Sequence, residues 1–209
     1  IIIVDGIFLA ILPFPPKEEA PKAADGTVEK RKMKLTPSAI LLVCIGFTAS
    51  TTFMLFMNCN QGLGKLYGMA NPSMIQSFYS AGIICAVLLT AALMKKGLKP
   101  IRVLVIYPCV AFCALLLMYF VQIPQICMVG GFLIGYFAAG GVLQLATSTA
   151  NEMFPRDKGK ITAVVMIASS IANYAVVNVA SLLSKVGGVE GPRYILLFNA
   201  AVTAIGIVF

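Results

Sequence analysis

Amides and hydroxyls interrupt stretches of this sequence that are otherwise apolar. Ser169 and Asn173 are four residues apart and would share one face of a helix, as would Tyr174 and Asn178. An amide in an apolar environment must find a hydrogen-bond partner or face water. Each of these side chains therefore either joins two helices or lines a polar cavity. For Asn173 both alternatives stay open, and for Gln144 we favour the cavity.

Charged residues within the apolar stretches are the next candidates for chemistry. Asp5 lies eight residues before Pro13, which should end its helix, so its carboxylate would lie near the middle of that stretch. A carboxylate at that depth predicts proton or cation coupling, unless a basic partner neutralises it. Glu152 lies close to Arg156 and Lys160. This arrangement predicts either an ion-pair latch between helices or a solvent-exposed ion pair of little energetic value.

Residue types that most enzymes need are scarce. The chain has no histidine, so no histidine-based metal site or catalytic dyad can form from it. Its six cysteines include no Cys-x-x-Cys pair. Cys109 and Cys113 would share a helix face, where apolar packing is favoured over a metal or redox pair. We expect no metal, no cofactor and no enzymatic activity.

The composition is that of a polytopic membrane protein. Of the 209 residues, 59% are hydrophobic and 11% are charged, and the mean hydropathy is +0.93. So few charges could not cover the surface of a soluble domain of this size. A membrane-spanning helix needs about 20 apolar residues, and we expect spans at 37–58, 73–94, 101–121, 127–150, 160–184 and 193–209. Residues 1–14 read as the end of a preceding helix, 15–36 as a polar linker and 37–209 as a six-helix bundle.

Both ends of the chain are apolar, so we expect a fragment whose last helix is truncated. The basic residues alternate along the chain: 13 fall in the linker and in the loops after the second and fourth spans, and 3 in the other loops. This asymmetry follows the positive-inside rule and predicts a cytoplasmic linker. It also explains the net charge of +8 without nucleic-acid binding.

The layout resembles the C-terminal half of a major facilitator superfamily transporter. Segment 152–160, Glu-Met-Phe-Pro-Arg-Asp-Lys-Gly-Lys, is similar to the family's Glu-x-x-Pro-(x)-basic-Gly signature between helices ten and eleven. Segment 95–100 lies where the family repeats Gly-x-x-x-Asp-Arg-x-Gly-Arg-Arg, but Met94 replaces the acidic residue. Segment 12–19 looks like the start of the cytoplasmic loop between helices six and seven.

The resemblance implies secondary transport of a small organic solute by alternating access, proton-coupled or facilitated, with the solute near the midplane. The partners would be the solute, the lipid bilayer and an N-terminal half, in a bacterial inner membrane. The family's cavity helices correspond to spans that hold Asn58, Gln61, Tyr79, Gln144, Asn173 and Tyr174. The alternatives are a non-transporting sensor or receptor on the same fold and, less favoured, an intramembrane enzyme.

Overall fold

The computed structural model describes residues 37–97, 100–154 and 157–208. All of them belong to one compact unit, Leu35–Phe209. The expected helix end at 1–14 and the linker at 15–36 lie outside these residues, and so do Asp5 and Arg156.

The described residues form helices joined by short turns, which confirms the all-α class. The helices are α2 (Pro37–Leu66), α3 (Ser73–Lys95), α4 (Pro100–Phe120), α5 (Pro124–Ile134), α6 (Val142–Met153), α7 (Lys158–Gly187) and α8 (Gly191–Val208). A π-helical turn, η1 (Gly135–Ala139), follows α5, and a 3₁₀ turn, η2 (Gly188–Glu190), joins α7 to α8. Within the ranges that the structure describes, five helical segments are long and apolar enough to cross a membrane, and the last of them, Lys158–Val208, includes α7, η2 and α8.

The first helix is longer than expected. The prediction that it ends at 58 is wrong, because α2 continues through Gly62 and Gly64 to Leu66. Gly62 lies against the ring of Pro192 in α8, and Gly64 lies against Pro72. Tertiary packing thus outweighs the weak helix propensity of glycine. The chain turns away only at Gly68, whose φ of 75° is outside the helical range.

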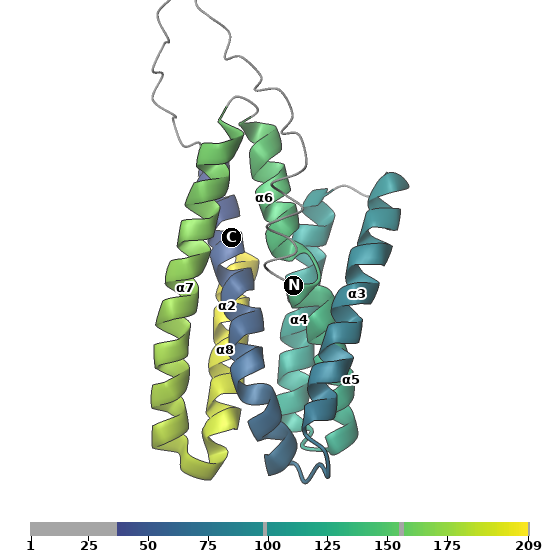
Figure 1. Cartoon of the computed structure of the whole chain (residues 1–209), viewed down its shortest axis with the longest axis vertical. Coiled ribbons are helices and arrows are strands. Elements are labelled where there is room, and N and C mark those ends of the chain that lie inside the picture. Colours follow the sequence, from purple (N-terminus) through teal and green to yellow (C-terminus); the bar gives the residue numbers. More distant parts are fainter. Residues whose placement is uncertain (1–36, 98–99, 155–156, 209) are drawn as a thin grey trace, which may run out of the picture. The chain divides into compact units, whose positions relative to one another are not determined.

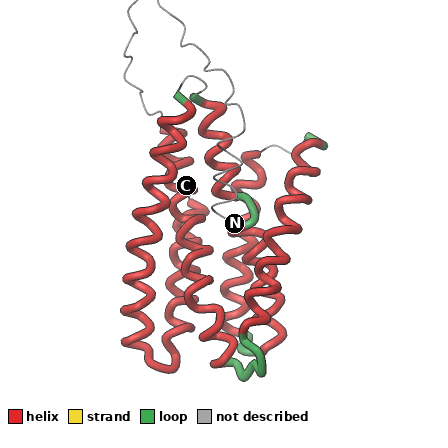
Figure 2. The backbone as a smooth tube through the Cα atoms, viewed as in Figure 1, coloured by secondary structure: helices red, strands yellow, loops and turns green. Residues whose placement is uncertain are grey.

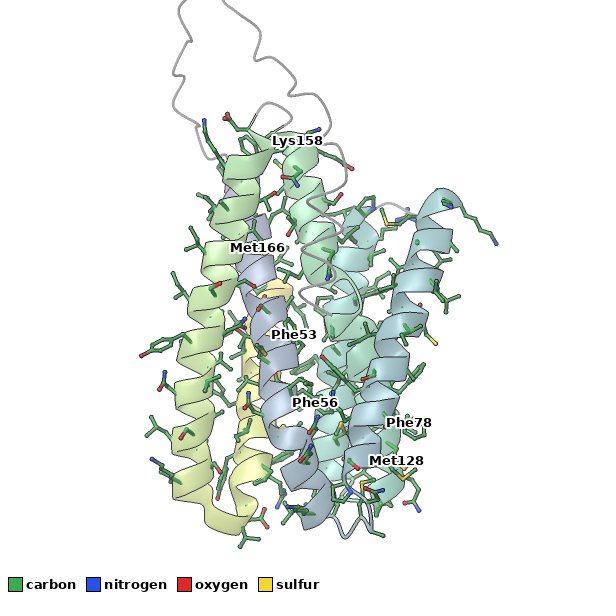
Figure 3. The ribbon with its side chains drawn as sticks, in the orientation of Figure 1. Phe53, Phe56, Phe78, Met128, Lys158 and Met166 are labelled. Carbon is green, nitrogen blue, oxygen red and sulfur yellow. The ribbon has the colours of Figure 1, made fainter. Side chains whose placement is uncertain are left out.

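Helix α2 is the centre of the bundle. Figure 1 shows α2 with α7 on one side and α3 on the other, and α2 also packs against α5, α6 and α8. The core includes Phe56 of α2, which packs against Tyr79 of α3 (Figure 3). At the end of α2, the hydroxyl of Tyr67 donates to the carbonyl of Met118 in α4 at 3.1 Å. Burial raises the pKa of Tyr67 to about 12.

The two ends of the bundle are named here by residues labelled in Figure 3. Lys158, at the start of α7, lies at one end, and Met128, in α5, lies towards the other. Helix α2 begins at the Lys158 end, and α7 runs from that end to the Met128 end (Figure 1). Helix α8 then returns beside α7, so the two helices are antiparallel neighbours.

The segment Pro124–Met153 is broken near its middle. Figure 2 shows the interruption between η1 and α6 as a short loop within the bundle. Gly140 and Gly141 form it, and Gly141 has a φ of 136°, which side-chain-bearing residues rarely adopt. The expected span at 127–150 corresponds to the segment Pro124–Met153, and the break within it is a feature that the sequence pattern did not predict. A helix that breaks at mid-depth exposes backbone polar groups, which protein or water must satisfy.

Glycines also bring α3 against α5 and η1. An added Cβ at Gly135 would overlap the carbonyl oxygen of Tyr79, and one at Gly82 would overlap that of Phe132. The two contacts are reciprocal, so the backbones of the two segments touch. Small residues allow this close approach between helices in membranes.

Candidate functional site

A polar pair joins the two longest helices at half their length. Ser50 of α2 donates its hydroxyl to Oδ1 of Asn173 in α7 at 2.9 Å. Each residue lies near the middle of a 30-residue helix. Ser50 is fully buried, whereas Asn173 is half-buried. The amide nitrogen of Asn173 makes no hydrogen bond within the described residues, so Asn173 joins two helices and still has donors to offer.

A second polar cluster lies between α2 and α8 at a similar depth. The hydroxyls of Thr52 and Thr203 are 2.8 Å apart, and Asn199 donates to the carbonyl of Thr52 at 2.9 Å. Oδ1 of Asn199 is buried and has no hydrogen-bond partner in the described part of the chain. Thr52 and Thr203 also line a small cavity that reaches Val142, at the start of α6 beyond the helix break. Sequence reasoning missed both threonines, because an isolated hydroxyl can bond to its own helix.

Three of the predicted cavity residues are exposed amides on the bundle. Asn58 and Gln61 lie on the half of α2 nearer the Met128 end, and Asn58 donates to the carbonyl of Met54 in its own helix at 2.8 Å. Gln144 lies in the first turn of α6, directly after the helix break, with exposed Ser148 one turn further on. In hydrocarbon such groups are unfavourable, so this surface suits contact with protein or water.

The two predicted tyrosines differ in their surroundings. Tyr79 is 4% exposed, and its ring lies 5.7 Å from that of Phe56, measured between centroids. Tyr174 is 77% exposed on α7. The structure therefore does not place them on one surface, and Tyr79 is part of the core.

The predicted latch residues lie at the Lys158 end. Lys160 pairs with Asp157 at 2.6 Å, in an exposed bridge within the first turns of α7. Glu152 is exposed and lines a hollow with Ser148, Asn151 and Lys158. A hydrogen bond from Thr162 of α7 to Asn151 of α6, at 2.9 Å, also links the two helices here. Among residues 37–97, 100–154 and 157–208, no three His, Cys, Asp or Glu side chains are grouped so that they could hold a metal ion.

Comparison with known proteins supports a common origin with transporters. The chain is 30% identical over 206 residues to the uncharacterized MFS-type transporter YfkL of Bacillus subtilis, a match that covers 96% of this chain and 51% of YfkL. It is 32% identical over 148 residues to the inner membrane transport protein YdiN of Escherichia coli, covering 69% of this chain and 35% of YdiN. It is 27% identical over 213 residues to YdiM, another inner membrane transport protein of E. coli, covering 99% of this chain and 51% of YdiM.

At most, then, the chain spans about half the length of these relatives. No family model matches it. No solved structure matches it at a significant level either.

Proposed function

We infer that this chain, a homologue of MFS-type transporters over nearly its whole length, forms one half of a secondary transporter. These relatives are transporters rather than enzymes, and two of them carry names that place them in the inner membrane. The observation that carries the proposal is this homology, together with the polar pair Ser50–Asn173 at mid-depth. The proposed activity is movement of a small organic solute across a bacterial inner membrane by alternating access.

We propose six membrane crossings for the bundle. As one straight helix, Lys158–Val208 would be about 77 Å long at 1.5 Å per residue, more than twice the roughly 30 Å hydrocarbon core. Helices α7 and α8 are instead antiparallel neighbours joined through η2. The segment therefore supplies two crossings, and the other four segments bring the number to six.

The Lys158 end is proposed to face the cytoplasm. The ends of α3 and α7 that this orientation assigns to the cytoplasm carry Lys95, Lys96, Lys158 and Lys160. The opposite end of the bundle carries Lys65, in the last turn of α2, and Lys185, in the last turn of α7. Cytoplasmic loops carry an excess of lysine and arginine. The linker at 15–36 would then also be cytoplasmic.

The solute is proposed to contact the seam between α2 and α7. Asn173 supplies free amide donors at mid-depth, and Asn58, Gln61, Gln144 and Tyr174 present polar groups on exposed parts of the bundle. An N-terminal half would cover this surface and complete the cavity. Tyr79 would shape that cavity from the core rather than touch the solute.

Coupling and gating are proposed for the charged residues. Asp5 is the candidate for proton coupling, which Asp5→Asn in the full-length transporter should abolish while exchange of unlabelled for labelled solute continues. Glu152 is the candidate for the cytoplasmic latch, with Arg156 and Lys160 as its basic neighbours. In the described structure Lys160 pairs with Asp157. A latch between Glu152 and Lys160 therefore requires Lys160 to release Asp157 and pair with Glu152 instead.

The test uses the full-length transporter in proteoliposomes, with counterflow measured for a panel of sugars, carboxylates and amines. Asn173→Ala should raise the KM of the transported solute several-fold, with little change in melting temperature. The matched control is Asn178→Ala, because Asn178 donates only to the carbonyl of Tyr174 in its own helix. An unchanged KM in Asn173→Ala would remove Asn173 from the site, and counterflow of no solute would favour a non-transporting sensor.

A further inference from the structure

A groove opens between α2, α7 and α8 towards the Met128 end. It has a volume of about 420 Å³ and is lined by Asn58 of α2, by Val177, Ala180, Ser181, Ser184 and Lys185 of α7, and by Ile195 of α8. Asn173 lies on the same helix, 12 residues before Lys185. That separation is about 18 Å at 1.5 Å per residue. The groove therefore lies along α7 from the polar pair at mid-depth, on the side of α7 that packs against α2.

The charge of Lys185 has no acidic partner in the described part of the chain. Three acidic residues are described there, and Glu152 and Asp157 lie at the Lys158 end. The third, Glu190, accepts a hydrogen bond from Arg193 at 2.8 Å. The groove thus holds a cation with no carboxylate among the residues that line it.

Neutral donors line the same groove as this cation. Ser181 and Ser184 make no side-chain hydrogen bond within the described residues, in contrast to Ser170, which bonds to the carbonyl of Met166 in its own helix. Asn58 uses one N–H of its amide on Met54 and keeps the other. Val177, Ala180 and Ile195 provide an apolar wall. An ammonium with hydroxyl and amide donors is the arrangement that recognises a carboxylate, because charge-assisted hydrogen bonds are the stronger ones.

We propose that this groove is a binding subsite for small organic carboxylates. Lys185 pairs with the carboxylate, Ser181 and Ser184 donate to its oxygens, and the apolar wall accommodates the hydrocarbon part of the solute. The subsite lies at the non-cytoplasmic mouth of the seam that leads to Asn173. This inference rests on the proposed transport function and specifies its substrate class.

The test measures melting temperatures of the full-length transporter in phosphatidylcholine nanodiscs at constant ionic strength. The probes are sodium benzoate, lactate and glutarate, each compared with its neutral amide. At least one carboxylate should raise the melting temperature by about 2 °C or more at a concentration well above its Kd, and its amide should not. Lys185→Gln should abolish the shift, and Lys185→Arg should retain it. Lys95→Gln, which removes an exposed cation at the other end of the bundle, should leave the shift unchanged.

The inference would be overturned if none of the three carboxylates gave a shift, or if the shift persisted in Lys185→Gln. The same measurement in nanodiscs that contain phosphatidylglycerol distinguishes a solute-binding site from a lipid-binding site. A Lys185-dependent shift seen only with that lipid, and not with the carboxylates, would also overturn it. If the same preparation then shows counterflow of a neutral solute, only the carboxylate subsite is rejected and the transport function stands. Absence of all counterflow would reject the transport function itself.

Discussion

Two seams of this bundle are built from opposite kinds of residue. Between α3 and α5–η1, Gly82 and Gly135 bring the backbones into direct contact. Between α2 and α7, Ser50 and Asn173 form a side-chain hydrogen bond, and a groove opens further along α7. The first is called here the glycine seam and the second the polar seam.

Under the proposed function, the difference means that tight backbone packing and solute contact belong to different pairs of helices. Close packing in the glycine seam gains dispersion contacts that any added atom would disturb. A hydrogen bond between membrane helices is worth only about 0.6 kcal/mol on average, so the Ser50–Asn173 bond by itself contributes little to stability. Mutations in the two seams should therefore separate melting temperature from solute affinity.

The largest expected effect on stability belongs to the glycine seam. Gly135→Ala places a methyl group against the backbone carbonyl of Tyr79, which cannot move as a flexible side chain would. Overpacking of this kind costs about 1–3 kcal/mol in the free energy of unfolding. We expect a fall of several degrees in the melting temperature of the full-length transporter.

Gly159→Ala is the matched control, because a Cβ at Gly159, in the first turn of α7, meets no atom within 4 Å. The same change there should leave the melting temperature equal or slightly higher, since alanine reduces the entropy of the unfolded chain. Equal losses of stability at positions 135 and 159 would contradict the close backbone contact.

The helix break gives an intermediate test. Gly141 and Gly68 both have positive φ, at 136° and 75°, and a Cβ at either meets no atom within 4 Å. Alanine in such sparsely populated backbone conformations costs on the order of 1–3 kcal/mol, so both variants should melt a few degrees lower. We expect only Gly141→Ala to slow counterflow as well, because its strain lies at mid-depth. If Gly68→Ala slows counterflow to the same extent, the break has no special role in transport.

The smallest expected effect on stability belongs to the polar seam. Ser50→Ala removes the donor to Asn173 and should lower the melting temperature by about 2 °C or less. The KM of the transported solute should nevertheless change, because the Asn173 amide loses the bond that orients it. A fall in melting temperature as large as that of Gly135→Ala would remove the distinction between the two seams.

Much of the fold could be predicted from local sequence. The span expected at 73–94 corresponds to α3 (Ser73–Lys95), and that at 101–121 corresponds to α4 (Pro100–Phe120). The break at Gly140 and Gly141 could not be predicted, because dense glycines favour both close helix contacts and helix ends. The same stretch does both: Gly135 packs against Tyr79, whereas Gly141 interrupts the helix.

The candidate site could be predicted only as a set of residues. The sequence allows either an interhelical bond or a cavity for Asn173, and the structure shows the bond together with free donors on the same amide. Its partner Ser50 is 123 residues away and has no distinctive pattern around it. Lys185 is one of the three basic residues that the sequence places in the other loops, and nothing local shows that α2 and α8 bring Asn58 and Ile195 into the same groove.

By itself, the sequence determined a bundle of apolar helices, their approximate bounds and the distribution of charge between their ends. Those properties depend on composition and on the length of each apolar stretch, which are local. The tertiary structure alone decided that Tyr79 is enclosed, that Ser50 meets Asn173 and that Lys185 faces a groove with no acidic lining. Each of these depends on which helices are neighbours, and that follows from how the whole chain packs.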